Sequence, residues 1–224
     1  MRQIPLSIGI ESPRTFETFV PGANALAIAH LQALGAQAAP VYLWGGSGAG
    51  KTHLLEALVH RFDEQGMRAG WFSAGDAAPW AFEDAWSLIV IDNADALDAE
   101  QQHAAFSVFV EATTRGVPLV AAGRVPPVDL AVREDLRTRF GWGPVFALQA
   151  LDEAGTRSVL LREAGHMGLK LTPDVMDYLL TRFARDLTSL LSLLQQLNSF
   201  SIAELRPVTV PLLKKMIAEE GLAA

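Results

Sequence analysis

The pattern of apolar and polar positions divides the chain into two parts. Up to about residue 149, short apolar runs rich in β-formers alternate with segments of helical periodicity, as in folds whose parallel strands are buried between helices. The predicted strands cover residues 41–44, 69–73, 88–92, 118–122 and 144–148. From residue 150 on, only amphipathic helical patterns remain. The pattern therefore predicts an α/β sandwich around a five-stranded parallel sheet, followed by a small helical bundle.

Residues typical of helix ends set the limits of the predicted helices. Asn24 is an N-cap candidate for a helix that closes at Gly35, and Asp98 with Gln101 forms a capping-box pattern for a helix that ends at Gly116. Further helices are predicted over residues 127–137, 152–164, 172 onward, 186–197 and 211–220. We expect three regions: a tail over residues 1–15, an α/β domain over 16–149 and a helical domain over 150–224.

The stretch from Val41 to His53 has the order strand, glycine-rich loop, helix. It contains the sequence Gly45-Gly46-Ser47-Gly48-Ala49-Gly50-Lys51-Thr52, which is the P-loop, or Walker A, motif in its structural context. Glycines let several backbone N–H groups wrap around phosphate oxygens, and the start of the next helix adds unpaired N–H groups. Lys51 is predicted to reach the terminal phosphates and Thr52 to ligate Mg²⁺. The chain is therefore predicted to bind a nucleotide, with ADP and ATP as the candidates.

The run Leu88-Ile89-Val90-Ile91-Asp92 predicts a buried parallel strand with a carboxylate at its C-terminal end. Ligands bind at that end of the strands in open α/β sheets. The run matches a Walker B element, in which Asp92 would hold Mg²⁺ through water. In many such ATPases a second acid follows and orients the attacking water. Here that position is Asn93, which cannot accept a proton.

The charge of the chain bears on its partners. It has 224 residues and a formal net charge of −7, with the basic residues scattered among more numerous acids. Tight DNA binding usually needs a basic stripe that makes ~6–10 phosphate contacts. Direct, sequence-specific DNA binding is therefore disfavoured, and a protein partner is favoured.

Composition also limits the compartment and the chemistry. The chain contains no cysteine, which excludes disulfides, thiolate metal sites and a cysteine nucleophile and fits a reducing compartment. The N-terminus lacks the apolar core of a secretory signal, and no window approaches the ~20 apolar residues of a membrane span. We expect a soluble, cytoplasmic protein.

Two further features each allow two interpretations. Arg139 follows a predicted helix, where it is either a solvated arginine or an arginine finger that reaches the phosphates of a neighbouring subunit. The tail residues Gln3, Ile4, Pro5 and Leu6 either lie loosely on the surface or dock in a groove of a partner as an extended peptide.

On these residues the chain resembles a known family. A P-loop α/β domain followed by a helical lid is the AAA+ layout, and residues 16–22, 45–55 and 137–143 resemble the bacterial replication initiator DnaA. No helix-turn-helix domain follows the lid in this sequence. A DnaA-like AAA+ module with a short glutamine-led tail resembles the Hda family of DnaA regulators, and the resemblance covers nearly the whole chain.

The resemblance implies a function and assigns residues to it. Hda-type proteins work with ADP bound, as clamp-loaded activators of ATP hydrolysis by DnaA, and so act as negative regulators of replication initiation. Gln3, Ile4, Pro5 and Leu6 would bind the sliding clamp of the replicative polymerase, and Arg139 would be the arginine finger presented to ATP on DnaA. Mg²⁺ would be held by Thr52 and Asp92. The nucleotide would be held by Val20, Gly45, Gly46, Ser47, Gly48, Ala49, Gly50, Lys51, Thr52 and His53.

Three positions depart from the pattern of an active AAA+ ATPase. Asn93 replaces a second acid, Gly123-Arg124 stands where a sensor polar group is expected, and Thr188 occupies the place of a lid arginine. We therefore expect a tight nucleotide binder with little hydrolysis of its own, and we leave a homo-oligomer open. The alternatives are a self-sufficient AAA+ ATPase, a helicase-loading adaptor that binds single-stranded DNA, and a structural partner with a vestigial pocket.

Overall fold

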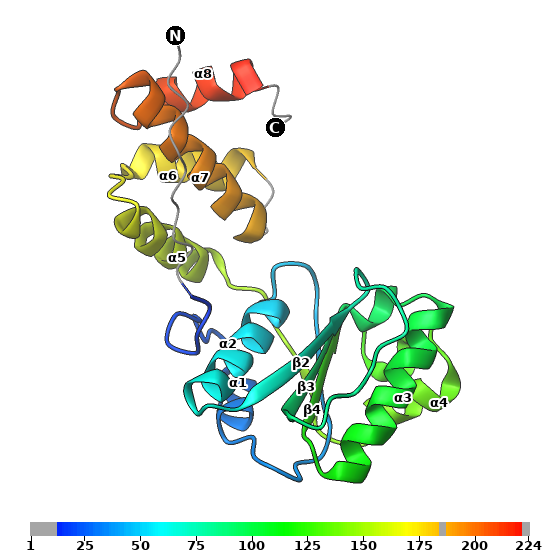
Figure 1. The fold of residues 1–224 in the computed structure, drawn as a ribbon. Coiled ribbons are helices and arrows are strands. Elements are labelled where there is room, and N and C mark those ends of the chain that lie inside the picture. The colour runs from blue at the N-terminus through cyan, green and yellow to red at the C-terminus, as the bar shows by residue number, and fades with distance from the viewer. Residues whose placement is uncertain (1–12, 184–186, 221–224) are drawn as a thin grey trace. The chain divides into compact units, whose positions relative to one another are not determined.

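The computed structural model describes residues 13–183 and 187–220, which divide into two compact units. One unit runs from Pro13 to Ala150, and the other contains the described chain from Leu151 on (Figure 1). Each unit has hydrophobic clusters of its own.

The first unit is built on a five-stranded parallel sheet with the strand order β2-β3-β4-β1-β5. The strands are β1 (Val41–Trp44), β2 (Arg68–Ser73), β3 (Trp86–Asp92), β4 (Leu119–Gly123) and β5 (Val145–Ala147). Strand β1, which leads into the P-loop, lies between β4 and β5, so that Trp44 pairs with Gly123 on one side and with Ala147 on the other. The predicted α/β sandwich with a five-stranded parallel sheet is confirmed.

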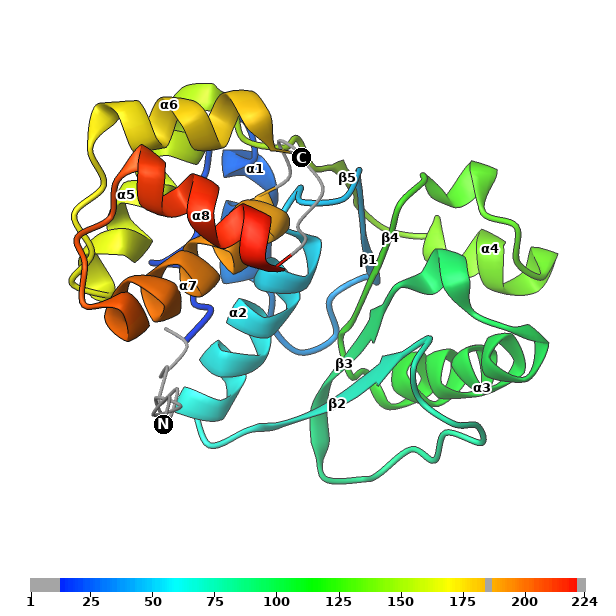
Figure 2. The same ribbon diagram turned by 90° about the horizontal axis from the view of Figure 1, so that it is seen from above.

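Helices cover both faces of this sheet, as Figures 1 and 2 show. Helices α1 (Ala25–Gln32) and α2 (Lys51–Glu64) lie on one face, and α3 (Ala99–Arg115) and α4 (Glu134–Phe140) lie on the other. Successive strand residues point to opposite faces, so Val90 packs on the α2 side while Ile89 and Ile91 pack on the α3 side. Burial on both faces explains why β3 is a continuous apolar run.

The second unit is helical. It consists of α5 (Glu153–His166), α6 (Pro173–Arg182), α7 (Leu187–Glu204) and α8 (Val210–Glu220). Helices α6 and α7 contribute to two adjoining clusters, one completed by α5 and the other by α8. Within the described chain, no helix combines the length and the apolar character needed to cross a membrane.

The capping box at the start of α3 is confirmed. The Asp98 carboxylate accepts from the backbone N–H of Gln101 (2.8 Å), and the Gln101 side chain accepts from the backbone N–H of Asp98 (2.9 Å). At the other end, Gly116 adopts the left-handed conformation (φ 68°) that favours glycine after a helix.

The predicted helix over residues 127–137 is confirmed only over its last residues, 134–137. A single 3₁₀ turn covers Pro127–Asp129, the chain is then non-helical to Arg133, and α4 begins at Glu134. Arg133 has an extended ψ of 140°, and its backbone N–H donates to the Gln102 side chain of α3 (2.9 Å) instead of to a helical carbonyl. At its other end α4 runs past the predicted residue 137 to Phe140, which places Arg139 in its last turn.

Asn24 also differs from its predicted role, because its side chain makes no cap for α1. The buried amide instead donates to the carbonyl of Gln149 (2.9 Å) and accepts from the Gln149 backbone N–H (2.8 Å). The two bonds fasten the start of α1 to the segment after β5. Helix α1 ends at Gln32, before the predicted Gly35, and α7 continues to Glu204, past the predicted residue 197.

Candidate nucleotide site and arginine face

The P-loop joins the end of β1 to the start of α2. Gly48 and Gly50 have φ values of 73° and 89°, in the left-handed region, and Gly50 is the N-cap of α2. A Cβ on Gly50 would lie 2.5 Å from the ring of Phe19, so both the backbone angle and the close approach require glycine here. The loop therefore has the conformation that exposes successive backbone N–H groups at a helix start.

The loop begins where three strands meet. The backbone N–H of Gly45 donates to the carbonyl of Gly123 at the end of β4 (3.3 Å). A Cβ on Gly45 would lie 2.5 Å from the carbonyl oxygen of Leu148, just after β5. Gly46 and Ser47 are exposed, whereas Ala49 is buried. The first half of the loop is thus fixed by the sheet, and its middle is open to a ligand.

Three predicted side chains meet at this edge of the sheet. The Lys51 ammonium donates to the carbonyls of Gly45 (2.8 Å) and Gly46 (2.9 Å), closing the loop on itself. The Thr52 hydroxyl donates to Asp92 (2.7 Å), whose side chain is almost fully buried at the end of β3. Partial burial lowers the pKa of the Lys51 amine, an effect that the nearby carboxylates of Asp92 and Asp95 oppose. Lys51, Thr52 and Asp92 are therefore brought together as the motifs predict.

The Thr52–Asp92 pair has the oxygen ligands that suit Mg²⁺, which is usually bound through one or two carboxylates, waters and substrate phosphates. In the described residues no group of three or more His, Asp or Glu side chains forms a metal cage. A magnesium ion at this edge would therefore depend on nucleotide phosphates for its remaining ligands. Asn93 follows in the left-handed conformation (φ 54°), is exposed, and donates its backbone N–H to Asp92 (2.8 Å).

Two charged residues that the motifs do not assign complete this edge. Asp95 accepts from the backbone N–H of Arg124 (2.9 Å), and its second oxygen lies 3.8 Å from Nε of the exposed Arg124 side chain. Asp95 stands three residues after Asp92 in sequence, so an acid shortly after the Walker B strand is the signal that would have found it. The structure thus places a carboxylate and a guanidinium beside the loop in addition to Lys51.

Tyr42 of β1 is another residue that sequence analysis missed. Its ring is fully buried, and its hydroxyl finds no hydrogen-bond partner among the described residues. The hydroxyl points to the Cα of Gly123, where a side chain would collide with it. Burial raises the pKa of the Tyr42 phenol above its usual value of about 10, and the charge of Asp95 adds to that shift.

We predict that Tyr42→Phe stabilises the first unit. A buried hydroxyl without a partner costs about 1–3 kcal/mol, and phenylalanine keeps the ring while removing that group. Because burial raises the folded-state pKa of this phenol, the unfolded state ionises first, and the wild type loses stability as pH rises above ~10. Urea denaturation should give a higher midpoint for the variant and a shallower decline above pH ~10. An unchanged or lower midpoint would mean that the hydroxyl is satisfied.

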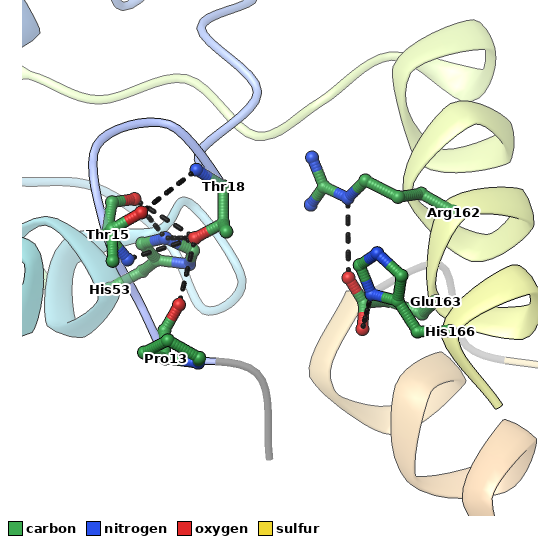
Figure 3. A network of polar contacts seen from close by, with 7 residues as sticks. All are labelled: Pro13, Thr15, Thr18, His53, Arg162, Glu163 and His166. Carbon is green, nitrogen blue, oxygen red and sulfur yellow. Dashed lines mark hydrogen bonds and ion pairs between the residues drawn. The ribbon is translucent and has the colours of Figure 1, made fainter. Parts of the chain in front are cut away.

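A short segment before α1 is fastened to the first turns of α2. Figure 3 shows Thr15 and Thr18 around the ring of His53, whose Nε2 lies 3.0 Å from the Thr15 carbonyl and 3.3 Å from the Thr18 hydroxyl. Phe19 contacts the same imidazole edge-on, with ring centroids 5.2 Å apart. Val20, predicted as a nucleotide contact, follows Phe19 and is half-buried. The structure therefore assigns the His53 side chain to this segment and leaves its backbone N–H in the loop-to-helix turn.

Arg139 lies on the opposite side of the sheet, in the last turn of α4. Its guanidinium carbon is 4.7 Å from the ring centroids of both Phe106 and Trp142 and 5.8 Å from that of Phe109. Within the ranges that the structure describes, the Arg139 side chain makes no hydrogen bond or ion pair. Arg139 is half-buried and Trp142 is 57% exposed, so the stack reaches the surface at the tryptophan. We call Arg139 with Phe106, Phe109 and Trp142 the arginine face.

Some predicted site residues have no structural description. Gln3, Ile4, Pro5 and Leu6, predicted to bind a clamp, lie outside the described residues. Thr188 belongs to α7, but the position of its side chain is not described.

Two protein-family models match separate parts of the chain. Residues 10–73 match the bacterial DnaA ATPase domain, and residues 152–217 match the lid domain of Hda. The N-terminal match contains the P-loop, β1 and β2, and the C-terminal match contains α5, α6 and α7.

Several solved structures share the fold. Domain III of the Thermotoga maritima replication initiation protein DnaA has a TM-score of 0.76 and 20% sequence identity, over 92% of this chain and 96% of that chain. AMPPCP-bound DnaA from Aquifex aeolicus has a TM-score of 0.70 and 21% identity, over 95% and 71% of the two chains. A variant of RuvB from Thermotoga maritima has a TM-score of 0.68 and 16% identity, over 95% and 75%.

At these sequence identities the solved structures support the fold alone. The assignment of the chain to a family rests on the two family-model matches. The P-loop site at the carboxyl edge of a five-stranded sheet and the Hda-type lid agree with it. The chain is a Hda/DnaA-like AAA+ protein.

Proposed function

We propose that this chain is a nucleotide-bound negative regulator of replication initiation that stimulates ATP hydrolysis by DnaA. One observation carries the proposal: aromatic rings hold the half-buried Arg139 beside the exposed Trp142, while no described carboxylate pairs with its guanidinium. An arginine finger must present an uncommitted cation to the phosphates of a neighbouring subunit. Arg139 meets that requirement on a domain related to DnaA.

The chain's own nucleotide would be a resident ligand. Backbone N–H groups of Gly45 to Thr52 would surround the phosphates, and Lys51 would exchange its two loop carbonyls for phosphate oxygens. Thr52 and Asp92 would hold Mg²⁺, which would neutralise phosphate charge. The fold shared with AMPPCP-bound DnaA supports an adenine nucleotide, ADP or ATP. Binding at the end of β1 would stabilise the loop and the start of α2.

Hydrolysis of that nucleotide by the chain itself would be slow. The residue after Asp92 is Asn93, whose amide cannot take a proton from water. Asp95 is the next acid in this segment, but its oxygens face the backbone N–H and side chain of Arg124. The arrangement therefore favours retention of the nucleotide over turnover.

The tail would supply the second partner, the sliding clamp. Residues that follow it in the chain are fastened to α2, where Arg14 pairs with Glu56 (3.0 Å) and Thr18 contacts His53 (3.3 Å). A tail attached to this segment would tether the AAA+ unit to a clamp on DNA and raise its local concentration near DnaA. Extended peptides with spaced aliphatic side chains suit such a groove.

We predict that Gln3→Ala abolishes retention of the protein on immobilised clamp and leaves the fold unchanged. The glutamine would be the anchoring side chain of the tail, and the described cores contain no residue near it in sequence. A clamp affinity column and circular dichroism would measure the two properties. Ser7→Ala, in the same tail, is the control and should keep retention. Equal retention of wild type and Gln3→Ala would exclude this anchor.

The deciding experiment measures hydrolysis of DnaA-bound ATP in four arms: DnaA alone, with this chain, with DNA-loaded clamp, and with both. The proposal requires the largest rate when both are present. Rapid turnover by the chain without DnaA would instead support a self-sufficient ATPase. A salt-dependent shift of single-stranded DNA by the chain alone would support a helicase-loading adaptor. Failure to recover nucleotide from the purified protein would indicate a vestigial pocket.

A further inference from the structure

The surroundings of Arg139 are unusual for a surface arginine. Phe106 of α3 and Trp142, two residues after α4, each lie 4.7 Å from the guanidinium carbon. Phe109 lies behind them and contacts Trp142 edge-on, with the ring centroids 5.9 Å apart. Rings from two separate elements therefore contact one cation.

Aromatic stacking restrains a guanidinium without using its N–H groups. The delocalised cation is attracted to the ring faces through its flat sides, while the donors lie at its edge. A carboxylate would occupy those donors directly. Stacking can thus hold the arginine in one orientation and still leave the donors available for phosphate oxygens.

Arg133 provides a contrast on the same ring. Its guanidinium lies 5.6 Å from the Phe106 centroid, but it also donates to Asp135 (2.7 Å) and lies 2.8 Å from Nδ1 of His103. The donors of Arg133 are therefore engaged within the chain. Of these two arginines, only Arg139 combines aromatic contact with unoccupied donors among the described residues.

The backbone holds Trp142 in place. The Trp142 N–H donates to the carbonyl of Arg139 (3.1 Å), which closes the last turn of α4 on itself. Gly143 follows so close to the carbonyl of Pro40 that a side chain there would collide with it. The indole is nevertheless 57% exposed, so little of the core depends on it. A large exposed aromatic ring, fixed by its backbone beside a cation, has little structural reason to be there.

We propose that Phe106 and Trp142 form an aromatic clamp that positions the Arg139 guanidinium for insertion into the ATP site of DnaA. This inference rests on the proposed function and assigns two positioning residues to it. The aromatic clamp restricts the conformations of the Arg139 side chain before the partner binds, so less side-chain entropy is lost on insertion. It acts on the orientation of the finger, and therefore on the rate of the stimulated reaction.

Two other roles for Trp142 predict different changes in the stimulated rate. If stacking on Trp142 withheld Arg139 from the partner, removal of the indole would release the finger and raise the stimulated rate. If Trp142 were only a docking contact, its removal would raise the concentration of the chain needed for half-maximal stimulation and leave the maximal rate unchanged. The sign and the kinetic parameter therefore separate the three roles.

The experiment measures DnaA–ATP hydrolysis against the concentration of this chain, with DNA-loaded clamp present. Trp142→Leu removes the ring face and is expected to lower the maximal rate by about 3- to 30-fold, the range that a surface to desolvated cation–π contact allows. Phe106→Leu should lower it in the same way. Trp142→Phe keeps an aromatic face and should restore most of the rate. Arg137→Ala, on the same helix, controls for loss of charge.

A second readout does not involve DnaA. Ring faces close to an arginine side chain shift its NMR signals upfield, so the Arg139 Hδ signals should move downfield in Trp142→Leu and only slightly in Trp142→Phe. Unchanged Arg139 signals in Trp142→Leu would show that the aromatic clamp is not formed in solution and would overturn the proposal.

The outcomes distinguish failure of the aromatic clamp from failure of Arg139 as the arginine finger. In an Arg139→Ala background, Trp142→Leu should have no further effect on the maximal rate, because both changes remove the same positioned group. If Arg139→Ala lowers stimulation but Trp142→Leu leaves or raises the maximal rate, the aromatic clamp is wrong and the assignment of Arg139 as the arginine finger is kept. If Arg139→Ala itself leaves stimulation intact, the proposed function is wrong, and so is the aromatic clamp that rests on it.

Discussion

Arg139→Ala should reduce the stimulated hydrolysis of DnaA-bound ATP by ~10³–10⁵-fold, the contribution of an arginine finger supplied in trans. The guanidinium would stabilise charge that develops on the γ-phosphate of the partner, and alanine cannot replace it. The fold should be retained, because the Arg139 side chain makes no ion pair or hydrogen bond in the part of the chain that is described. Single-turnover hydrolysis by DnaA, with chain and clamp in excess, measures the loss.

Two controls identify the cause of such a loss. Arg137→Ala removes the same charge from the same helix, and among the described residues Arg137 makes no cation–π contact with the rings of the arginine face. It should keep most of the stimulation. Nucleotide content and the thermal unfolding curve of Arg139→Ala should match those of the wild type. Undiminished stimulation by Arg139→Ala would remove the finger from the mechanism, and an equal loss in Arg137→Ala would indicate a general effect of surface charge.

Lys51→Ala should weaken nucleotide binding by ~10- to 150-fold, which corresponds to the loss of charge-assisted hydrogen bonds worth about 1.5–3 kcal/mol. Lys51 is the only lysine of the P-loop, and its ammonium already lies at the loop, within 2.9 Å of the Gly45 and Gly46 carbonyls. The variant should also lose the rise in melting temperature that nucleotide gives to the wild type, because a ligand stabilises only through its occupancy. Equilibrium binding of a fluorescent ADP analogue measures the affinity directly.

Lys170→Ala is the matched control for this change. Lys170 is exposed in the helical unit, outside the P-loop motif, and its replacement removes the same charge. It should leave ADP affinity unchanged. If Lys51→Ala binds ADP as tightly as the wild type, the phosphates do not reach this lysine and the site must be placed elsewhere.

The two predictions separate the two roles of the chain. Lys51 acts on the nucleotide that the chain carries, whereas Arg139 would act on a nucleotide that another protein carries. They lie at separate places in the first unit: Lys51 is the first residue of α2 on one face of the sheet, and Arg139 lies in the last turn of α4 on the other. A regulator that keeps its own nucleotide and promotes hydrolysis of another requires both.

Local patterns in the chain were sufficient for much of the fold and for the core of the site. The Gly45–Thr52 loop, the run that ends at Asp92 and the capping box at Asp98 each depend on residues within a few positions of one another. The physical requirements behind them are local too: a positive φ, burial on both faces, or an N–H within one helical turn. For that reason these features could be located without knowing what packs against them.

Only the tertiary structure shows the contacts between residues that lie far apart in the chain. Asp95 meets Arg124 because β4 lies beside β1 and β3, and strand order does not follow from chain order. The helix expected over residues 127–137 broke because Arg133 bonds to Gln102, which belongs to another helix. Arg139 lies against Phe106, which stands 33 positions earlier in the chain. Such contacts depend on tertiary packing, which competes with local propensity and here overrides it.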